Sequence, residues 1–543
     1  MTSTTNTLAL VGGLMVVGMV YPANASDEKG DPIVLETPPR FAFESIQPTF
    51  EDESAAPSQL GRILVRGGFV SVQVNVDQFG DNIPGDAANE PSIAVDFDDP
   101  SRLVIGWRQF DTIRSDFRQA GWAYSHDGGQ AWTFPGVLEP GVFQSDPVLE
   151  ADADGVFYYY SLHIEPTFAC DMYISTDGGV SWEVPNPAFG GDKAWMAIDR
   201  TGGLGHGHIY TSWSWAAACC GFDTFTRSTD GGFDFLVPIF IPPAPPVFGT
   251  MSVGPDGELY TAGIDFPSFS NSNFLIVRSS NAQDPDKTPT FDLGTQVNMG
   301  GSLTGASGPN PAGLLGQTWV ATDHSDGPTR GNVYMLCSVN PQGSDPLDVH
   351  FVRSQDGGAT WSAPIRVNDD PNNNGAWQWF GTMSVAPNGR IDVIWNDTRN
   401  DPADNFSELF YSSSSDAGVT WSKNVALSAP FDHSLGYPQQ QKLGDYYDMI
   451  SDNTGAHIAY AATFNGEQDV YYLRVDVAEE PGCEGDANGD GVVDPLDSGF
   501  VLARFGCPVG TGDPSCDAAD QNGDGVVDPL DSGFVLARFG ECP

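Results

Sequence analysis

The sequence predicts an all-β protein of the β-propeller class, followed by a small α-helical domain. Between residues 63 and 477, a pattern of strands and polar turns recurs about seven times. The motif Ser-x-Asp-x-Gly-x-x-Trp accompanies five of these units, intact or as a variant. Near the C-terminus the segment NGDGVVDPLDSGFVLARFG occurs twice, beginning at Asn488 and at Asn522. Two kinds of repeat therefore define two domains.

The first 25 residues have the pattern of a secretory signal peptide. Leu8 to Val20 is an apolar run of signal-peptide length, too short to span a bilayer, and Ala23-Asn24-Ala25 fits a small-residue cleavage site. The usual basic residues are missing from the first seven positions. Residues 26–62 are acidic and proline-rich, which is typical of a flexible segment. We expect a secreted, extracellular protein, and no other segment is apolar for long enough to cross a membrane.

The formal net charge is −49, from 72 acidic and 23 basic residues. This balance argues against nucleic acid as a partner, because phosphates require lysine and arginine. The excess of carboxylates suits a calcium-binding protein, although most of it serves solubility. Eight cysteines in an exported chain predict disulfides, and the lack of any Cys-x-x-Cys pair argues against a zinc ribbon or a thioredoxin-like site.

The duplicated segment has the ligand spacing of a twelve-residue, EF-hand-type calcium loop. Oxygen ligands fall at loop positions 1, 3, 5, 9 and 12, a glycine stands at the sharp turn, and position 7 offers its backbone carbonyl. The first loop supplies Asp486, Asn488, Asp490, Val492, Asp494 and Asp497, and the second supplies Asp520, Asn522, Asp524, Val526, Asp528 and Asp531. Position 12 is Asp instead of Glu, so its reach is shorter by one methylene. The spacing predicts two Ca²⁺ ions as cofactors.

A duplicated unit in which a helix follows each calcium loop, and none precedes it, resembles the type I dockerin. The resemblance covers residues 486–543, and residues 478–485 are the predicted linker to the propeller. It implies attachment to a cohesin-like protein on a scaffold or a cell surface. In that family, side chains at loop positions 10 and 11 help to select the partner and are often Ser or Thr. Here they are Pro495-Leu496 and Pro529-Leu530, which leaves an apolar docking surface of another specificity.

Four cysteines flank the two copies: Cys483, Cys507, Cys516 and Cys542. A helix of about ten residues is about 15 Å long, whereas the Cα atoms of a disulfide lie within about 7 Å. A bond from one end of a helix to the other is therefore disfavoured. If the two helices pack antiparallel, each helix end lies near the start of the other loop, which favours Cys483–Cys542 and Cys507–Cys516.

The other four cysteines belong to the propeller. Cys170, Cys219 and Cys220 fall in neighbouring loops and could cross-link them, whereas Cys337 lies within a predicted strand, where burial is expected. Their pairing is left open.

The Ser-x-Asp-x-Gly-x-x-Trp motif occurs in full at residues 125–132, 175–182 and 354–361, with variants at 228–235 and 414–421. These motifs resemble the Asp box, or BNR repeat, of the sialidase superfamily. The residue types suit a hairpin turn, because Asp and Ser bond the turn backbone, Gly supplies a positive φ, and Trp packs beneath. Since five copies cannot all line one site, we expect a structural role for them.

Each propeller unit contains a strand that ends in an Asp, Asn or Gly turn, an aromatic-rich second strand, and a third strand that leads into the motif. Four-stranded units repeated in this way form a β-propeller. We favour seven blades, although sialidases have six and six remains an alternative. The last unit has only three strands after Asp445, and the alternating segment Phe69–Val76 is predicted to supply the fourth and close the ring.

The strand order predicts a candidate site on the face opposite the Asp boxes. Strands in a blade are antiparallel, so that face collects the entries to the first strands and the loops between the second and third strands. Arginine forks suit carboxylates, and aromatic rings suit sugar faces. The predicted ligand-binding residues are Arg108, Arg114, Arg118, Arg399, Trp195 and Trp379. Other residues at the same strand entries include Glu90, Asp146, Lys193 and Asp445.

The resemblance to sialidases implies catalytic roles as well. In that superfamily three arginines hold a carboxylate, a Tyr is the nucleophile and an Asp is the acid; the loose counterparts here are Tyr446 and either Asp111 or Asp192. Two functions therefore remain open. One is a propeller that binds a glycan, with an acidic sugar as the specific option, or a protein. The other is an exo-acting glycoside hydrolase of the sialidase type, which suits a dockerin-like module because dockerins are usually joined to polysaccharide-degrading modules. The seventh blade and a missing Arg-Ile-Pro motif favour binding.

Overall fold

A computed structural model describes residues 63–164, 167–265, 273–341, 343–477, 485–488, 492–510 and 514–541. The chain divides into two compact units, Met1–Val475 and Asp476–Pro543, and each is described by itself. The predicted signal peptide, the 26–62 segment, Asp490, Cys483 and Cys542 lie outside the described residues. In the part of the chain that is described, no helix is long and apolar enough to span a membrane.

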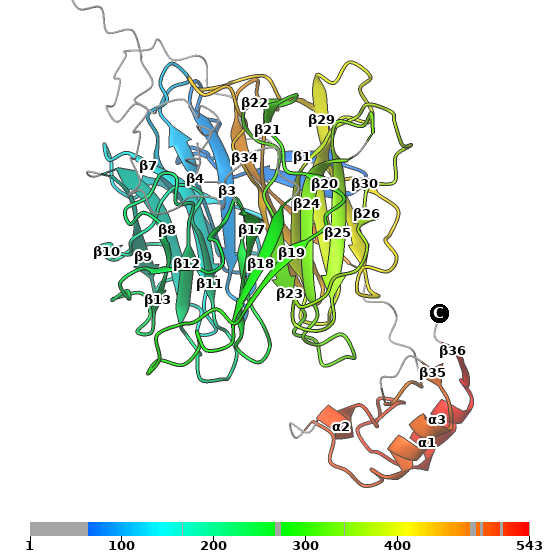
Figure 1. Ribbon diagram of the computed structural model, residues 1–543. Coiled ribbons are helices and arrows are strands. Elements are labelled where there is room, and N and C mark those ends of the chain that lie inside the picture. The colour runs from blue at the N-terminus through cyan, green and yellow to red at the C-terminus, as the bar shows by residue number, and fades with distance from the viewer. Residues whose placement is uncertain are drawn as a thin grey trace, which may run out of the picture. The chain divides into compact units, whose positions relative to one another are not determined.

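The described strands of the first unit form a seven-bladed β-propeller, which confirms the predicted fold class (Figure 1). The first blade contains β3 (Ala87–Val95), β4 (Leu103–Phe110), β5 (Gln119–Ser125) and β6 (Thr133–Val137). The second contains β7 (Gln144–Ala151), β8 (Phe157–Ile164), β9 (Phe168–Ser175) and β10 (Asn186–Pro187). The third contains β11 (Trp195–Ile198), β12 (Ile209–Ser212), β13 (Asp223–Ser228) and β14 (Ile239–Phe240). All neighbouring strands within them are antiparallel.

In the fourth and fifth blades the innermost strand is split into two short pieces. The fourth blade contains β15 (Pro246–Val247) with β16 (Met251–Val253) as its split inner strand, then β17 (Leu259–Asp265), β18 (Phe274–Ser279) and β19 (Leu293–Val297). The fifth contains β20 (Gly301–Ser302) with β23 (Trp319–Thr322), then β24 (Val333–Pro341), β25 (Asp348–Ser354) and β26 (Ile365–Arg366). The sixth contains β27 (Gln378–Val385), β28 (Ile391–Asp397), β29 (Phe406–Ser414) and β30 (Val425–Ala426), and β31 (Phe431–Asp432) also pairs with β29.

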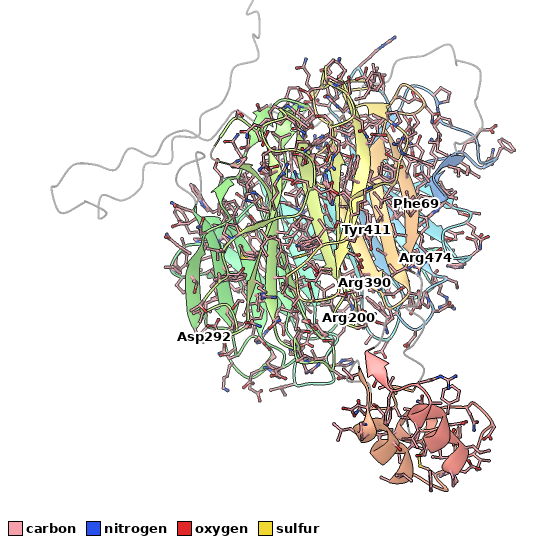
Figure 2. All side chains as sticks on the ribbon, turned by 90° about the vertical axis from the view of Figure 1, so that its right-hand side faces the viewer. Phe69, Arg200, Asp292, Arg390, Tyr411 and Arg474 are labelled. Atoms are coloured by element: carbon pink, nitrogen blue, oxygen red, sulfur yellow. A yellow bond between two sulfur atoms is a disulfide. The ribbon has the colours of Figure 1, made fainter. Side chains whose placement is uncertain are left out.

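The seventh blade joins the two ends of the propeller chain. Its strands are β32 (Asp448–Asp452), β33 (Gly455–Ala462), β34 (Asp469–Asp476), β2 (Phe69–Gln73) and β1 (Ile63–Arg66). β2 pairs antiparallel with β34, with Ser71 opposite Leu473. Figure 2 shows Phe69 of β2 and Arg474 of β34 on the side where the two ends meet. The predicted ring closure is therefore confirmed, and β1 adds a fifth strand that the sequence did not indicate.

Apolar side chains hold neighbouring blades together. The largest core cluster includes residues from five successive blades: Tyr158, Met196, Leu259, Leu336 and Trp395. Inner strands such as β3 and β4 are buried along their whole length, polar residues included. Neighbouring blades therefore pack against one another through buried apolar side chains.

A hairpin inserted between β20 and β23 was not predicted. Its strands are β21 (Gly305–Ser307) and β22 (Asn310–Leu314). Asn310 donates to the carbonyl of Gly444 at 2.8 Å and accepts from the amide of Leu443 at 2.9 Å, and the amide of Ala312 donates to the carbonyl of Gln441 at 3.0 Å. The hairpin thus holds the connection between β31 and β32, which carries several residues of the candidate site.

The second unit contains α1 (Pro495–Leu502), α2 (Pro514–Asp517), α3 (Pro529–Leu536), β35 (Val492–Val493) and β36 (Gly540–Glu541). The two repeats pair reciprocally. β35 of the first loop pairs with β36 after α3, and Pro508 after α1 bridges Val526 of the second loop. The hydroxyls of Ser498 and Ser532 lie 2.8 Å apart between the two helices. A helix after each loop was predicted. Because the apolar side chains of the two copies form one buried cluster, one copy alone would leave its apolar face uncovered.

Candidate functional site

The entries to the inner strands share an unusual backbone conformation. Glu90, Asp146, Lys193, Phe248 and Phe380 all have left-handed backbone, with φ of 51°, 46°, 53°, 59° and 60°. Such residues cost about 1–3 kcal/mol each and persist only where the surroundings impose them. Because the position holds Phe in two blades, the conformation is a property of the blade. What distinguishes the first three blades is that this residue is charged.

Six buried charged residues meet at these entries, and we call them the axial charge cluster. They are Glu90, Arg108, Asp146, Lys193, Lys442 and Asp445. The Lys193 ammonium lies 3.0 Å from Asp146 and 2.7 Å from Asp445. The Lys442 ammonium lies 2.6 Å from Asp445 and 3.3 Å from Glu90, and Arg108 Nε lies 3.1 Å from Glu90. Three cations thus balance three carboxylates.

The neighbours of each carboxyl group decide its pKa. Burial alone would raise the pKa of Asp146 and Asp445, but Lys193 and the other cations outweigh burial and hold both values well below the usual range. At Glu90 burial prevails over Arg108 and Lys442, and the pKa rises to about 7. The cluster therefore contains two permanent carboxylates and one that titrates near neutrality.

Arg108 is fully buried, and its hydrogen bonding is incomplete. Its Nε donates to Asn89 Oδ1 at 2.8 Å, and its Nη1 donates to the side-chain carbonyl of Gln440 at 3.1 Å. Its Nη2 has no hydrogen-bond partner among the described residues, and neither carboxylate oxygen of Glu90 has hydrogen-bond geometry. An unpaired buried guanidinium nitrogen marks a place where a further acceptor would be stabilised.

Tyr446 lies beside this cluster, among aromatic side chains. Its ring packs edge-on against Trp195 at 5.5 Å, and Trp195 packs against Trp319 at 5.2 Å. Its hydroxyl donates to the carbonyl of Pro147 at 2.9 Å, and burial raises its pKa well above the usual value. Trp195 and Trp319 also line a cavity of about 430 Å³ bounded by the inner strands.

The remaining predicted residues are distributed around this cluster. Arg118 is buried and adjoins it, because its Nε donates to Ser145 Oγ at 2.9 Å, and that hydroxyl donates to Asp146 at 2.6 Å. Asp192 is half-buried, and its carboxylate lies 3.5 Å from the Lys193 ammonium. The exposed Asp111 and Arg114 lie on the 111–118 loop, where Gln439, next to Gln440, donates to the backbone carbonyl of Ser115 at 3.3 Å.

Two predicted ligand-binding residues lie elsewhere, in the sixth blade. Arg399 pairs with Asp397 at 2.8 Å and with Asp369 at 2.5 Å, and its guanidinium stacks on Phe410 at 4.5 Å. Trp379 is fully buried and donates to Ser407 Oγ at 3.1 Å. Both side chains therefore serve the packing of this blade, and neither contacts the axial charge cluster.

The Asp boxes form turns, as their residue types predicted. In the first box, Ser125 Oγ donates to Asp127 at 2.8 Å and accepts from the amide of Gly129 at 2.9 Å, while Asp127 also accepts from the amide of Ala131 at 3.0 Å. The fourth blade, which lacks the motif, keeps part of the network, since Asn281 accepts from Ser279 Oγ at 3.2 Å. Boxes therefore close hairpins and do not converge on one site.

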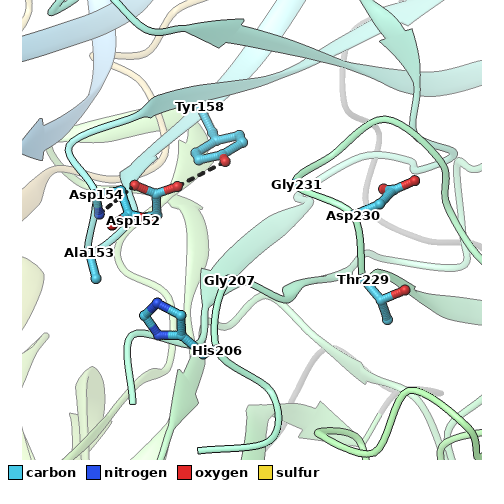
Figure 3. Close-up of a pocket in the computed structure, with 9 residues that line it drawn as sticks. All are labelled: Asp152, Ala153, Asp154, Tyr158, His206, Gly207, Thr229, Asp230 and Gly231. Carbon is cyan, nitrogen blue, oxygen red and sulfur yellow. Dashed lines mark hydrogen bonds between the residues drawn. The ribbon is translucent and has the colours of Figure 1, made fainter. Parts of the chain in front are cut away.

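A separate pocket lies beside one Asp box. It has a volume of about 280 Å³ and is lined by Asp152, Asp154, Tyr158, His206 and Asp230, among others (Figure 3). The hydroxyl of Tyr158 donates to Asp152 at 3.0 Å. Three carboxylates and no lysine or arginine line this pocket, so it does not suit an anionic ligand.

Several predicted ligands of the calcium loops accept hydrogen bonds from the loop backbone. Asp497 and Asp531 at position 12 are fully buried and accept hydrogen bonds from the loop amides of Asn488 at 2.9 Å and Asn522 at 3.0 Å. Asp494 and Asp528 at position 9 begin the helices as N-caps. In the second loop Asp520 accepts from the amide of Gly525 at 2.8 Å.

This donor set fits a calcium ion. Every side-chain donor that the loops offer is a carboxylate or an amide, and such oxygens are the ligands that Ca²⁺ prefers. Position 5 of the first loop, Asp490, lies outside the described residues. Val492 and Val526 at position 7 are extended residues whose carbonyls are the predicted backbone ligands.

Lys442 and Gln440 were not predicted from the sequence. Both lie on the connection between β31 and β32, which contains no repeat motif. The charged strand entries Glu90 and Asp146 carried a local signal, because each precedes a proline where an inner strand begins. No comparable signal marks Lys442, since its position depends on the β21–β22 hairpin.

The cysteines follow the prediction in part. Cys507 and Cys516 form a disulfide with a Cα–Cα distance of 5.6 Å, as predicted. Cys219 and Cys220 bond to each other and so do not cross-link neighbouring loops. Cys170 lies within β9 as a buried free thiol, and Cys337 is a buried free thiol in β24, as expected.

Comparisons with known proteins found one family model and a set of solved structures. The model of the BNR/Asp-box repeat matches residues 173–184. None of the curated proteins compared with the chain matches it. Among solved structures, a protein of unknown function from Dyadobacter fermentans is 16% identical over 75% of this chain and 98% of that chain, with a TM-score of 0.44.

Two further solved structures are similar in the same range. A Hadza microbial sialidase is 13% identical over 72% of this chain and 66% of that chain, with a TM-score of 0.36. The BP39L lectin from Burkholderia pseudomallei is 13% identical over 72% of this chain and 97% of that chain, with a TM-score of 0.44. The chain is a seven-bladed β-propeller that carries BNR/Asp-box repeats.

Proposed function

We propose that the protein is an exported glycan-binding propeller that holds the carboxylate of an acidic sugar at Arg108. One observation carries the proposal: among the described residues, Nη1 of this buried guanidinium donates to the neutral amide of Gln440 at 3.1 Å, and Nη2 has no hydrogen-bond partner. A hydrogen bond between charged groups is roughly twice as strong as one between neutral groups. A carboxylate would therefore displace the Gln440 amide.

Access requires movement of the covering side chain, because Arg108 is fully buried. Gln440 belongs to the connection that the β21–β22 hairpin holds, and this connection meets the 111–118 loop at Ser115. Arg114 on that loop and Asp192 at the neighbouring strand entry are at least partly exposed. We propose that these two residues contact the hydroxyl groups of the sugar once its carboxylate has replaced Gln440.

Binding without hydrolysis is favoured by the state of Tyr446. A tyrosine nucleophile needs a hydroxyl that can lose its proton, whereas this hydroxyl donates to the carbonyl of Pro147 at 2.9 Å. Burial and the charges of Glu90 and Asp146 raise its pKa further above the usual value. The three cations nearby are already paired with carboxylates.

Hydrolysis remains a second candidate function because of Glu90. Its pKa of about 7 suits a general acid or base at neutral pH, and its two oxygens lack hydrogen-bond geometry with the described residues. In this alternative Glu90 would transfer the proton that the predicted Asp111 or Asp192 was expected to transfer.

A glycan array with the mature chain tests the binding proposal. We expect sialylated or uronic-acid glycans to bind better than their neutral counterparts. Arg108→Lys keeps the charge but loses the fork, so it should weaken binding at least tenfold. Arg390→Lys is the matched control, since Arg390 is a buried arginine paired with Asp392 at 2.9 Å in another blade. Preference for neutral glycans, or equal loss in both variants, would contradict the proposal. Release of a reporter from sialosides, abolished by Glu90→Gln, would favour the hydrolase.

We further propose that the second unit is a calcium-dependent, dockerin-like attachment module for a cohesin-like partner. Leu496 and Leu530, at equivalent places in the two copies, are each 65% exposed. Paired apolar side chains at the start of both helices suit a protein partner more than they suit solvent. Calcium would stabilise the loops that position them, because it neutralises carboxylates that otherwise repel one another.

Binding of the full chain to a panel of cohesin modules tests this attachment. We expect binding in calcium that chelator abolishes, and loss in the double variant Leu496→Asp with Leu530→Asp. Leu502→Asp with Leu536→Asp changes two exposed leucines at the other ends of the same helices and should retain binding. Binding that survives both chelation and the first double variant would rule out this surface.

A further inference from the structure

We propose that Asp86, Glu467 and Asp469 bind a calcium ion at the point where the two ends of the propeller chain meet. We call these three residues the latch carboxylates. One oxygen from each lies within 4.8 Å of one oxygen from each of the others. Asp86 precedes β3, whereas Glu467 and Asp469 lie at the turn into β34. Asp86 and Asp469 are almost completely buried, at 3% and 0% exposure.

No cation of the described residues neutralises this group. The partners of the latch carboxylates are neutral: Gln109 donates to Asp86 at 2.8 Å, Asn75 donates to Asp469 at 2.9 Å, and the amide of Gly85 donates to Glu467 at 2.7 Å. The charges that act on Asp86 are those of Asp469 and Glu467, and both are negative. Three carboxylates this close repel one another strongly in a buried place.

Unsatisfied oxygens provide a second, independent observation. Asp86 Oδ1 is buried and has no hydrogen-bond partner among the described residues, and the same holds for Asn465 Oδ1. Asn465 belongs to this group, because its amide nitrogen donates to Asp469 at 2.8 Å. Buried acceptors are paired in the great majority of cases, so two unpaired acceptors beside three carboxylates call for a positive ligand.

The donor set selects the class of cation. Carboxylate and amide oxygens are present, whereas no imidazole or thiolate belongs to the group. Such hard oxygen donors suit Ca²⁺, which accepts six to eight of them in flexible geometry, better than zinc or copper. Without a cation, burial raises the pKa of Asp469 to about 7, so protonation is the competing way to relieve the repulsion.

The position gives the ion a definite role. Asn82, on the segment that follows β2, donates to Glu467 at 2.5 Å, and Asn75 on the same segment donates to Asp469. These contacts join residues 385 and 394 positions apart. An ion bound by Asp86, Glu467 and Asp469 would tie the N-terminal segment to the last blade and would stabilise the closed ring.

Metal content separates this site from the calcium loops. The background is the full chain with Asp486→Ala and Asp520→Ala, which removes ligands of both loops. After dialysis against calcium and then against metal-free buffer, we expect one equivalent of calcium per chain. Asp469→Asn should lose it. Asp448→Asn is the matched control, because Asp448 is a buried acid of the same blade that accepts from Ser92 at 2.7 Å and does not belong to the group of three carboxylates.

Thermal unfolding of the same background chain with calcium and with chelator provides a second measurement. We expect calcium to raise the midpoint by several degrees and Asp469→Asn to remove this response. Glu467→Gln, at a partly exposed position, is the alternative variant if Asp469→Asn does not fold. An equal midpoint with and without calcium in the background chain would overturn the proposal. So would an Asp469→Asn variant that keeps its bound calcium, and a protonated carboxyl cluster would be the remaining explanation.

Discussion

The axial charge cluster and the latch carboxylates are both built around three buried carboxyl groups, but they neutralise them differently. On the axis, Lys193, Lys442 and Arg108 lie within 3.3 Å of the carboxylates. At the latch, the described hydrogen-bond donors are side-chain amides, backbone N–H groups and the hydroxyl of Tyr471, and all of them are neutral. The protein thus carries its own cations at one site, while the other is arranged to take one from solution.

The pKa shifts follow this difference in neighbours. Asp146 and Asp445 on the axis are buried, yet nearby cations lower their pKa values. Asp86 and Asp469 at the latch are equally buried, and burial raises theirs. Burial alone therefore does not determine whether the pKa of a carboxyl group rises or falls, because the direction also depends on which charges lie nearby.

Removing one cation from the axis should have the largest effect. Lys193→Met leaves Asp146 and Asp445 buried beside one another without their shared partner. Breaking a buried pair in this way costs about 3–5 kcal/mol, so we expect the free energy of unfolding to fall by that amount. Lys287→Met removes an exposed lysine paired with Asp284 at 2.7 Å and should leave stability unchanged in denaturant melts. Equal effects of the two substitutions would show that the axial pairs do not differ from surface pairs.

The pH dependence of stability should isolate Glu90. Its pKa is raised from 4.5 to about 7, so the folded state binds a proton that the unfolded state releases between these values. The stabilisation is fully present below pH 4.5 and is lost as the pH rises through 7, with an upper limit of about 3 kcal/mol. We expect the free energy of unfolding of the wild type to fall relative to that of Glu90→Gln from pH 5 to pH 8, because only Glu90 titrates. A difference that is constant with pH would place the pKa of Glu90 near its ordinary value.

A lysine at the latch should make it behave like the axis. Asn465→Lys brings an ammonium to the position whose amide now donates to Asp469 at 2.8 Å. At saturating calcium the bound ion should contribute about 2–3 kcal/mol, and we expect this calcium-dependent part to disappear in the variant, which would be stable in chelator. Asn465→Gln keeps an amide and should retain the calcium response. If the lysine variant responds to calcium as the wild type does, charge is not what the latch lacks.

The smallest effect is expected at the Asp boxes, which belong to neither site. Asp127→Ala removes acceptors for the amides of Gln130 and Ala131 at 2.9 Å and 3.0 Å. The turn is exposed, so the free energy of unfolding should fall by about 1 kcal/mol, with glycan binding and the calcium response unchanged. A loss of glycan binding without destabilisation would move the binding site to the face that carries the boxes.

The sequence was most informative where structure is decided by neighbours along the chain. The Asp-box turns, the helices after Asp494 and Asp528, and the alternating strand at Phe69 all depend on local residue types, and all were predicted. The seven blades follow from these local repeats. Each Asp box marks a turn on one face of the ring. The strand order therefore indicated which loops lie on the opposite face.

The composition of the sites could not be predicted in the same way. Lys442 reaches the axis because a hairpin of another blade holds its connection, and Trp379 is covered by Ser407 and by the ring of Phe380 at 4.5 Å. Asp86 and Asp469 become neighbours only when the ring closes. These contacts join segments far apart in the chain, and their residue types carry no pattern that indicates a partner.

Ring closure also sets the order in which the molecule can be completed. β2 is among the first strands to be synthesised, and its partner β34 is the last strand of the propeller. Ser71 of β2 can therefore pair with Leu473 only after β34 has been synthesised. Until that pairing forms, both strands are open edges that another chain could occupy. A chain that stops before Asp469 keeps all five Asp boxes, yet one edge of β2 stays unpaired because β2 then pairs only with β1. Synthesis of the final blade is therefore the step that allows the ring of seven blades to close.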